Sequence, residues 1–392
     1  MKEGWEYKKL GEICDFEGGS QPPKSEWINH PQNGYVRMLQ IRDFTKSRNA
    51  EIEYVKITKK LRLCKDDDIL IGRYGASVGK ILTGLAGAYN VAIIKSIPNE
   101  ELIRKDFIRR YFESSLFQSI LFKVCTSRAA QAGFSKDDIK DELIPVPPLS
   151  EQQSIVDYLD SAFAKIDAMK ANAEKALNEA KALFQASLKE MLEPKEGWEE
   201  KPLKELGLTQ TGTTPSKSDK ANYGDFIEFI RPSEIDYDGN GGIDYNCEMR
   251  LSKQGASKGR IFASNSIFMV CIGATIGKVG FSTKDISCNQ QINVFTPKDV
   301  INYKFAYYAM RSPSFQYRVI KEGTSSQATL PIINKGKWEQ LSIKFPVIED
   351  QEIIATHLDS LSSKVLELKA NYDKISQECD ALKQAILRQV FE

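Results

Sequence analysis

Two glycine-rich stretches come closest to a motif that acts on phosphate. Residues Gly75–Lys80 have the sequence Gly-Ala-Ser-Val-Gly-Lys, and Gly273–Lys278 have the sequence Gly-Ala-Thr-Ile-Gly-Lys. A nucleotide-binding P-loop requires four residues between its glycines and a Ser or Thr after its lysine. Here three residues separate the glycines, and Ile81 or Val279 follows the lysine. The stretches therefore predict either a tight turn between two buried strands or a turn whose N–H groups and lysine contact nucleic-acid phosphate.

The residues for other catalytic chemistry are missing from the sequence. The two histidines, His30 and His357, are too few for a histidine-based nucleophilic site that occurs twice. No Gly-x-Gly-x-x-Gly follows a predicted strand, and no Asn- or Asp-Pro-Pro-aromatic run of the adenine methyltransferase kind is present. The seven cysteines form no Cys-x-x-Cys pair, which indicates a reducing cytoplasm without a zinc site. We expect no catalysis, metal or cofactor in this chain.

Polar side chains that can recognise base edges remain, set among aromatic and basic residues. Arginine suits the O6 and N7 atoms of guanine, and asparagine or glutamine suits N6 and N7 of adenine. Taken singly, each such residue is more often a surface or capping group. The candidates of the first half are Lys24, Arg37, Gln40, Arg42, Arg73, Tyr74, Lys80, Asn90, Arg128 and Gln131. Those of the second half are Lys217, Arg231, Thr275, Lys278, Asn289, Gln290 and Gln327.

Two long stretches, 150–193 and 349–392, must position these candidates. Each carries small or apolar residues at alternating steps of four and three, the heptad pattern of a helix that buries one stripe against a partner helix. The alternative is that each helix packs only on its own globular domain, but the matching register favours a coiled coil between the two. The predicted buried seam includes Ile155, Leu159, Ala162, Ile166 and Leu183, and then Ile354, Leu358, Leu361, Val365, Leu368, Ile375, Leu382 and Ile386.

The globular stretches repeat as well. The loop Gly19–Lys24, Gly-Ser-Gln-Pro-Pro-Lys, returns as Gly212–Lys217, Gly-Thr-Thr-Pro-Ser-Lys. If Asp43 corresponds to Glu234, then Gln40 corresponds to Arg231, and one position holds different base readers in the two halves. The predicted fold is α+β: mixed α/β domains at 1–149 and 194–348, and long helices at 150–193 and 349–392. Within the domains, 106–122 and 303–318 carry aromatic residues at helical spacing.

The charge is distributed unevenly over this plan. The net charge of the whole chain is +1, yet 1–150 and 194–348 each carry +4, whereas 151–193 carries −3 and 349–392 carries −4. A mild excess of positive charge on the globular parts weakly favours a polyanionic partner. No apolar run approaches the length that spans a membrane, and the first residues contain no apolar signal segment.

The ordered set of features resembles the specificity subunit of type I restriction–modification systems. The resemblance rests on the duplication, the Pro-Pro-Leu-Ser-Glu-Gln run at 147–152, the Gly-x-x-Pro-x-Lys loops, the Gly-x-x-x-Gly-Lys turns and the paired heptads. The second helix start, Val347–Asp350, departs from the first. The resemblance implies two target recognition domains that bind the halves of a split double-stranded DNA sequence, related by a pseudo-two-fold axis and held apart by an antiparallel coiled coil.

It also implies methyltransferase subunits that use S-adenosylmethionine, and a motor–nuclease subunit that uses ATP and Mg²⁺. If the seam from Ile155 to Ser187 holds the domains apart, it spans about 48 Å at 1.5 Å per residue. That length corresponds to roughly 14 base pairs of B-DNA at 3.4 Å each. Two other classes stay open: a duplicated coiled-coil adaptor that does not bind DNA, and a methyltransferase with a degenerate site.

Overall fold

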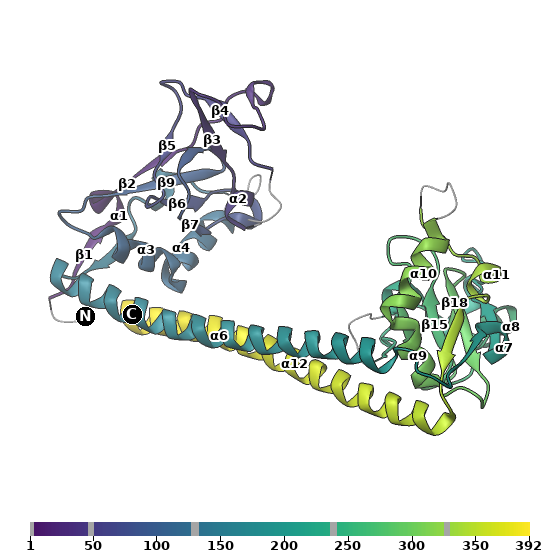
Figure 1. Ribbon diagram of the computed structural model, residues 1–392. Coiled ribbons are helices and arrows are strands. Elements are labelled where there is room, and N and C mark those ends of the chain that lie inside the picture. The colour runs from purple at the N-terminus through teal and green to yellow at the C-terminus, as the bar shows by residue number, and fades with distance from the viewer. Residues whose placement is uncertain (1–3, 46–50, 127–132, 236–240, 325–329) are drawn as a thin grey trace. The chain divides into compact units, whose positions relative to one another are not determined.

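The computed structural model describes residues 4–45, 51–126, 133–235, 241–324 and 330–392. The chain forms two compact units. Unit 1 comprises Met1–Ala171 and Ile375–Glu392, and unit 2 comprises Asn172–Lys374. Each unit therefore combines a globular part with a stretch of both long helices (Figure 1).

The described residues of unit 1 form three small sheets. The two-stranded sheet pairs β1 (Glu6–Lys9) with β10 (Leu143–Val146). The first four-stranded sheet has the order β2 (Cys14–Gly18), β9 (Ile93–Pro98), β6 (Ile69–Gly72) and β7 (Ile81–Leu82), and all its pairs are antiparallel. The second has the order β4 (Tyr54–Lys56), β3 (Tyr35–Leu39), β8 (Gly87–Tyr89) and β5 (Leu63–Cys64). Within this sheet β3 and β8 run parallel, so their carboxyl ends lie side by side.

Short helices close the unit 1 core. The apolar run at Ile69–Ile71 is buried on both faces of its sheet, and α3 (Lys105–Glu113) covers one face with Phe107, Tyr111 and Phe112. The predicted helix at 106–122 is two helices, because Ser114 is extended and its hydroxyl donates to Tyr111 O at 2.6 Å. The helices and 3₁₀ turns are α1 (Leu10–Ile13), η1 (Lys24–Glu26), α2 (Ile41–Thr45), η2 (Gly75–Ser77), α3 (Lys105–Glu113), α4 (Ser115–Thr126) and α5 (Lys136–Ile139).

Unit 2 repeats this plan. Its sheets are β11 (Glu199–Pro202) with β19 (Ser342–Phe345); β12 (Gly207–Thr211), β18 (Ile292–Pro297), β15 (Ile267–Val270) and β16 (Val279–Phe281); and β14 (Arg250–Leu251), β13 (Tyr223–Ile230) and β17 (Ser287–Cys288). Strands β13 and β17 are parallel, as β3 and β8 are in unit 1. The helices are α7 (Leu203–Leu206), η3 (Lys220–Asn222), η4 (Pro232–Glu234), α8 (Lys253–Lys258), α9 (Tyr303–Arg311), α10 (Pro313–Thr324) and α11 (Lys335–Trp338). The predicted duplication is thus a repeated fold.

The two long helices are α6 (Leu149–Met191) and α12 (Ile348–Phe391). They pair antiparallel within unit 1, where Lys383 Nζ lies 2.6 Å from Asp167 and Lys170 Nζ lies 3.5 Å from Asp380. Cys379 Sγ lies 3.7 Å from the carbonyl of Ile166 in the same interface. The predicted α+β fold with antiparallel helices is confirmed.

The position of the buried seam differs from the prediction. Leu183 is 57% exposed and its neighbour Phe184 is buried; Leu382 is 47% exposed and Leu387 is buried. On α6 the buried seam contains Phe163, whereas the prediction placed Ala162 in the seam. The steps of four and three residues between seam positions therefore alternate in the opposite order. Both orders fit a 3.5-residue period, and burial of the larger phenylalanine rings decides between them. Leu159, Ile166 and Leu358 are buried, and the part-buried seam residues are Ile155, Ile354, Leu361, Val365, Leu368, Ile375 and Ile386.

A buried glutamine joins each long helix to its globular part. Gln152 Nε2 donates to Pro147 O at 2.8 Å and to Leu102 O at 3.1 Å, and its Oε1 accepts from Arg104 N at 2.8 Å. Gln351 makes the same three bonds in unit 2, to the carbonyls of Pro346 and Val300 and from Asn302 N. The glutamine of the Ser-Glu-Gln run is therefore a structural joint.

Candidate nucleic-acid interface

In each unit, three backbone segments meet where the parallel strands end. They are the residues that follow each of the two parallel strands and the loop that follows β2 or β12. We call this group the strand-end cluster. In unit 1, Asn90 N donates to Leu39 O at 3.1 Å, which joins the residues after β8 to those after β3. Ser20 N donates to Tyr89 O at 3.0 Å, which brings in the loop after β2. Unit 2 makes the equivalent bonds, from Asn289 N to Ile230 O at 3.0 Å and from Thr213 N to Cys288 O at 2.9 Å. The same backbone frame is thus built twice.

A glycine permits this close approach in both units. A Cβ on Gly19 would lie 2.1 Å from Asn90 O, and a Cβ on Gly212 would lie 2.1 Å from Asn289 O. These contacts are with backbone oxygens that the sheets hold in place, so a side chain would displace the loop. The Gly-x-x-Pro-x-Lys loops therefore begin with glycine for a packing reason.

Substituting Gly19→Ala should destabilise unit 1 by about 2–3 kcal/mol, because the added methyl group overlaps backbone atoms that cannot move aside. The matched control is Gly242→Ala, since a Cβ at Gly242 meets nothing within 4 Å. Urea unfolding of the two variants gives the comparison. Equal midpoints for Gly19→Ala and Gly242→Ala would show that the loop yields freely.

A buried carboxylate orders the residues after the first parallel strand. Asp43 Oδ2 accepts a hydrogen bond from Gln40 N at 2.7 Å, and its Oδ1 accepts one from Arg37 Nη2 at 2.8 Å. Glu234 Oε2 accepts from Arg231 N at 2.7 Å, and its Oε1 accepts from Arg231 Nη2 at 2.8 Å. Asp43 and Glu234 are 5% and 7% exposed. The structure thus places Gln40 and Arg231 at one equivalent backbone position.

The charge on Glu234 follows from its partners. Burial alone would raise the pKa of the Glu234 carboxyl, but hydrogen bonds from Arg231 and Ser233 hold it below its ordinary value. The carboxylate is therefore ionised at neutral pH and can bind the Arg231 guanidinium in a fixed orientation.

Three predicted site residues of unit 1 converge on Glu53, an acidic residue that the sequence analysis missed. Gln40 Nε2 donates to Glu53 at 3.0 Å, Arg42 Nη2 donates at 2.6 Å, and Lys24 Nζ forms an ion pair with the same carboxylate. Lys24 Nζ also lies 4.0 Å from the centre of the Trp27 ring. Burial opposes ionisation of Glu53, yet Lys24 and Arg42 hold its pKa below the ordinary value. Donors suited to phosphate or base edges are gathered around a single internal anion.

The Gly-x-x-x-Gly-Lys stretches are tight turns between antiparallel strands. Gln118 Nε2 donates to Gly79 O at 2.9 Å and Gln316 Nε2 donates to Gly277 O at 2.9 Å, which closes each turn from the following helix. Gly79 and Gly277 have φ of 78° and 89°, values that favour glycine. Lys80 lines a surface hollow together with Phe163 and Gln384 of the long helices, and no residue of the strand-end cluster is among the lining residues of this hollow.

The remaining predicted residues have diverse surroundings. Arg73 Nε donates to Phe134 O at 3.1 Å, and its guanidinium lies 5.1 Å from the ring centre of Tyr74. Asn90 and Asn289 accept hydrogen bonds from backbone N–H groups two residues later, so both cap turns. Gln290 accepts a hydrogen bond from the Thr214 hydroxyl. Lys217 and Thr275 are exposed and Lys278 is half-buried; Arg128, Gln131 and Gln327 lie outside the described residues.

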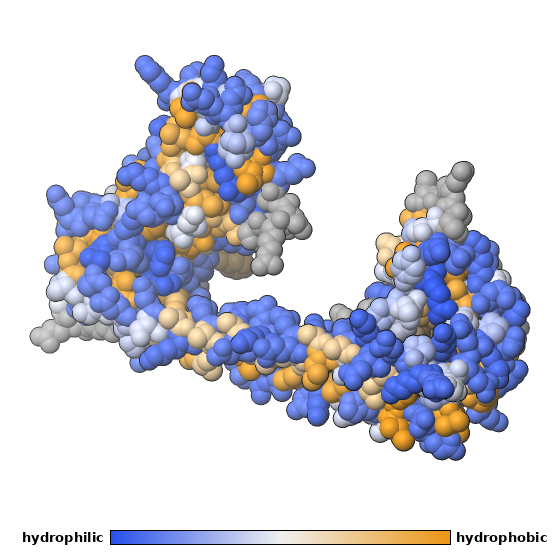
Figure 2. All heavy atoms as spheres, viewed as in Figure 1, coloured by the Kyte–Doolittle hydropathy of each residue, from blue (hydrophilic) through white to orange (hydrophobic). Residues whose placement is uncertain are grey.

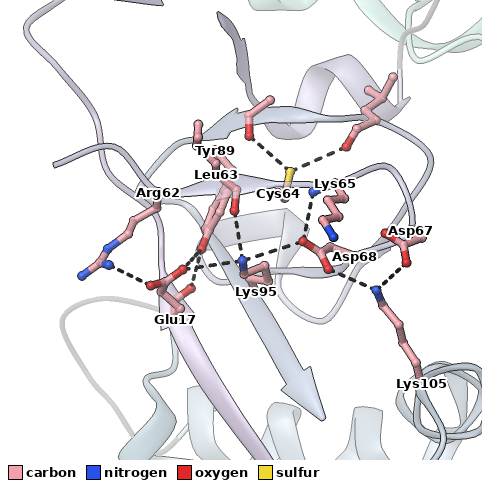
Figure 3. A network of polar contacts seen from close by, with 12 residues as sticks. Glu17, Arg62, Leu63, Cys64, Lys65, Asp67, Asp68, Tyr89, Lys95 and Lys105 are labelled. Atoms are coloured by element: carbon pink, nitrogen blue, oxygen red, sulfur yellow. Dashed lines mark hydrogen bonds and ion pairs between the residues drawn. The ribbon is translucent and has the colours of Figure 1, made fainter. Parts of the chain in front are cut away.

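A polar network adjoins the strand-end cluster of unit 1 through Tyr89 (Figure 3). Glu17 accepts a hydrogen bond from Tyr89 Oη at 3.0 Å and lies 3.7 Å from Lys95 Nζ. Burial first, and then the bond to Glu17, raise the pKa of the Tyr89 hydroxyl. The remaining ion pairs join Arg62 to Glu17, Lys95 to Asp68, and Lys105 to Asp67 and Asp68. With three cations matched by three carboxylates, the network adds nothing to the positive excess of this globular part.

Among the described residues, no three His, Cys, Asp or Glu side chains gather in a way that could hold a metal ion. No described helix is long and apolar enough to cross a membrane. The seven cysteines all lie within the described ranges, and no disulfide joins any of them.

Comparison with known proteins identifies the repeated unit. The profile of the type I restriction modification DNA specificity domain matches residues 2–179 and again 195–376. The chain belongs to this family. Both family matches extend from a globular part into a long helix, so the family unit is a domain together with its helix.

Named relatives agree with the family, and a solved structure shares the fold. The specificity subunit of the type I restriction enzyme HindI from Haemophilus influenzae is 30% identical over 49% of this chain and 41% of its own length. The EcoBI specificity subunit from Escherichia coli is 24% identical over 100% of this chain and 86% of its own length. A solved type I R-M system chain, from work on complex assembly and conformational transition, matches with a TM-score of 0.75 at 18% identity, over 100% and 98% of the two chains.

Proposed function

We propose that this chain is the DNA-recognition subunit of a type I restriction–modification complex, in which each globular part binds one half of a bipartite, asymmetric DNA target. The observation that carries the proposal is the strand-end cluster. One backbone frame is built twice in a family of DNA specificity domains, yet it carries Gln40 in one copy and Arg231 in the other. A shared frame with different base-reading side chains suits a target whose halves differ.

The chemistry then belongs to partner subunits. The chain would carry no catalytic step of its own and bind no cofactor. Methyltransferase subunits would supply S-adenosylmethionine chemistry on adenine, and a motor–nuclease subunit would use ATP and Mg²⁺, all in the cytoplasm. Apolar residues reach the surface along the long helices (Figure 2), and several exposed ones offer docking area, among them Met169, Leu183, Ile353 and Leu382. The antiparallel helices would set the spacer between the half-sites.

The direct test maps N6-methyladenine at single-base resolution after the chain is expressed with its cognate methyltransferase subunit. The expected result is a split motif with a fixed unspecified spacer. The purified complex should also bind that motif with an affinity that falls steeply as salt rises. Absence of methylation from a complex shown to have assembled would instead support the adaptor without DNA binding, and no observation on the described residues favours that alternative.

A further inference from the structure

The two copies of the strand-end cluster neutralise their buried carboxylate in different ways. In unit 1 the guanidinium on Asp43 comes from Arg37, six residues before it, while the residue three before it is Gln40. In unit 2 the guanidinium on Glu234 comes from Arg231, the counterpart of Gln40. The counterpart of Arg37 is Glu228, which pairs instead with Lys284 at 2.7 Å.

Because of this exchange, the Gln40 side chain is not needed to neutralise Asp43. Gln40 contacts Asp43 through its backbone N–H. Its side-chain amide donates to Glu53, which also receives Arg42. Because Arg37 already satisfies Asp43, the side chain at position 40 can vary without leaving a buried charge unpaired. The backbone is therefore fixed, while the Gln40 amide, with one N–H on Glu53, still has its second N–H and its Oε1 to offer to a base.

Arg231 is held by only part of its guanidinium. Its Nη2 and Nε lie 2.8 and 3.4 Å from the buried Glu234 carboxylate, which orients the planar group. The other acidic neighbour, Glu248, is 3.5 Å away and its side chain is 87% exposed, so it can move aside. A carboxylate that binds one edge of a guanidinium leaves the N–H groups of the other edge in a fixed orientation. This pair of donors suits O6 and N7 of guanine.

We infer that Gln40 and Arg231 each select one base of their half-site, adenine by Gln40 and guanine by Arg231, with Asp43 and Glu234 as positioning residues. This inference rests on the proposed function. Bidentate contacts of these kinds separate the right base from the wrong one by roughly 10- to 100-fold.

The test exchanges the two side chains in the complex with the methyltransferase subunit. Gln40→Arg should change one base of the first half-site from adenine to guanine, and Arg231→Gln should make the opposite change in the second. Methylome mapping and selection from randomised DNA duplexes both read the outcome. The other half-site and the spacer should stay as they are in the unchanged chain. Gln32→Arg adds the same charge to an exposed loop residue of unit 1 and controls for non-specific attraction.

The outcomes separate this inference from the proposed function. Suppose that the unchanged chain gives a split motif and that both variants, shown to be folded by urea unfolding, give the same motif. That result would overturn the inference alone. No split motif for the unchanged chain would overturn the proposed function itself. Asp43→Asn gives a second measurement that does not depend on the exchange. It should reduce discrimination at the same single base, whereas a purely structural role would weaken all positions of that half-site alike.

Discussion

Replacing Gln152 by alanine is expected to cost unit 1 roughly 4–6 kcal/mol of unfolding free energy. The substitution leaves Pro147 O, Leu102 O and Arg104 N without the partner that each has now. A buried polar group that loses its partner costs about 1–3 kcal/mol. Domain stabilities are typically about 5–15 kcal/mol, so the loss would take much of the total.

The neighbouring Gln153 provides the control. Its side chain bonds to Asp157 on the exposed side of α6, so Gln153→Ala should change stability by less than about 0.5 kcal/mol. Hydrogen exchange should show the loss in the first turns of α6. Gln351→Ala repeats the experiment in unit 2 with the same three bonds. Equal urea midpoints for Gln152→Ala and Gln153→Ala would show that the Gln152 hydrogen bonds do not hold α6 to the globular part.

Deleting one heptad from both long helices is expected to shorten the DNA spacer by about three base pairs. Residues 164–170 and 380–386 face each other in the antiparallel pairing, because Asp167 pairs with Lys383 and Lys170 with Asp380. Removing both segments preserves the seam spacing and shortens the helices by about 10 Å at 1.5 Å per residue. On B-DNA that length is about three base pairs.

Affinity should fall as well, since three base pairs rotate the second half-site by roughly 100° around the DNA axis. Methylation sites mapped for the double deletion give the spacer directly. Deleting 164–170 alone is the control, because it shifts the register of one helix against the other and should abolish stable folding of unit 1. A double-deletion variant that folds and methylates with the original spacer would refute the idea that the helices measure the spacer.

The sequence was sufficient for the architecture and insufficient for the geometry of the site. Heptad spacing and repeated loops are local signals, so the long helices and the duplication could be predicted. The phase of the seam could not, because Ala162 and Phe163 fit the same period and only packing separates them. The strand-end cluster depends on parallel pairing of β3 with β8, between residues about 50 positions apart, which no local pattern specifies. Glu53 was missed for the same reason, since its partners come from separate segments.

The antiparallel pairing also determines when unit 1 can be completed during synthesis. The ring of Phe391 lies 5.4 Å from those of Phe107 and Tyr111, and Gln384 Nε2 donates to the carbonyl of Glu113 at 3.1 Å. Phe391 is synthesised 280 residues after Tyr111. Part of the core of the first globular part therefore stays uncovered while unit 2 is translated. Until α12 has been synthesised, the apolar face of α6 is exposed and can bind chaperones or a second nascent chain. A premature stop before residue 375 would therefore harm the half of the protein that was made first.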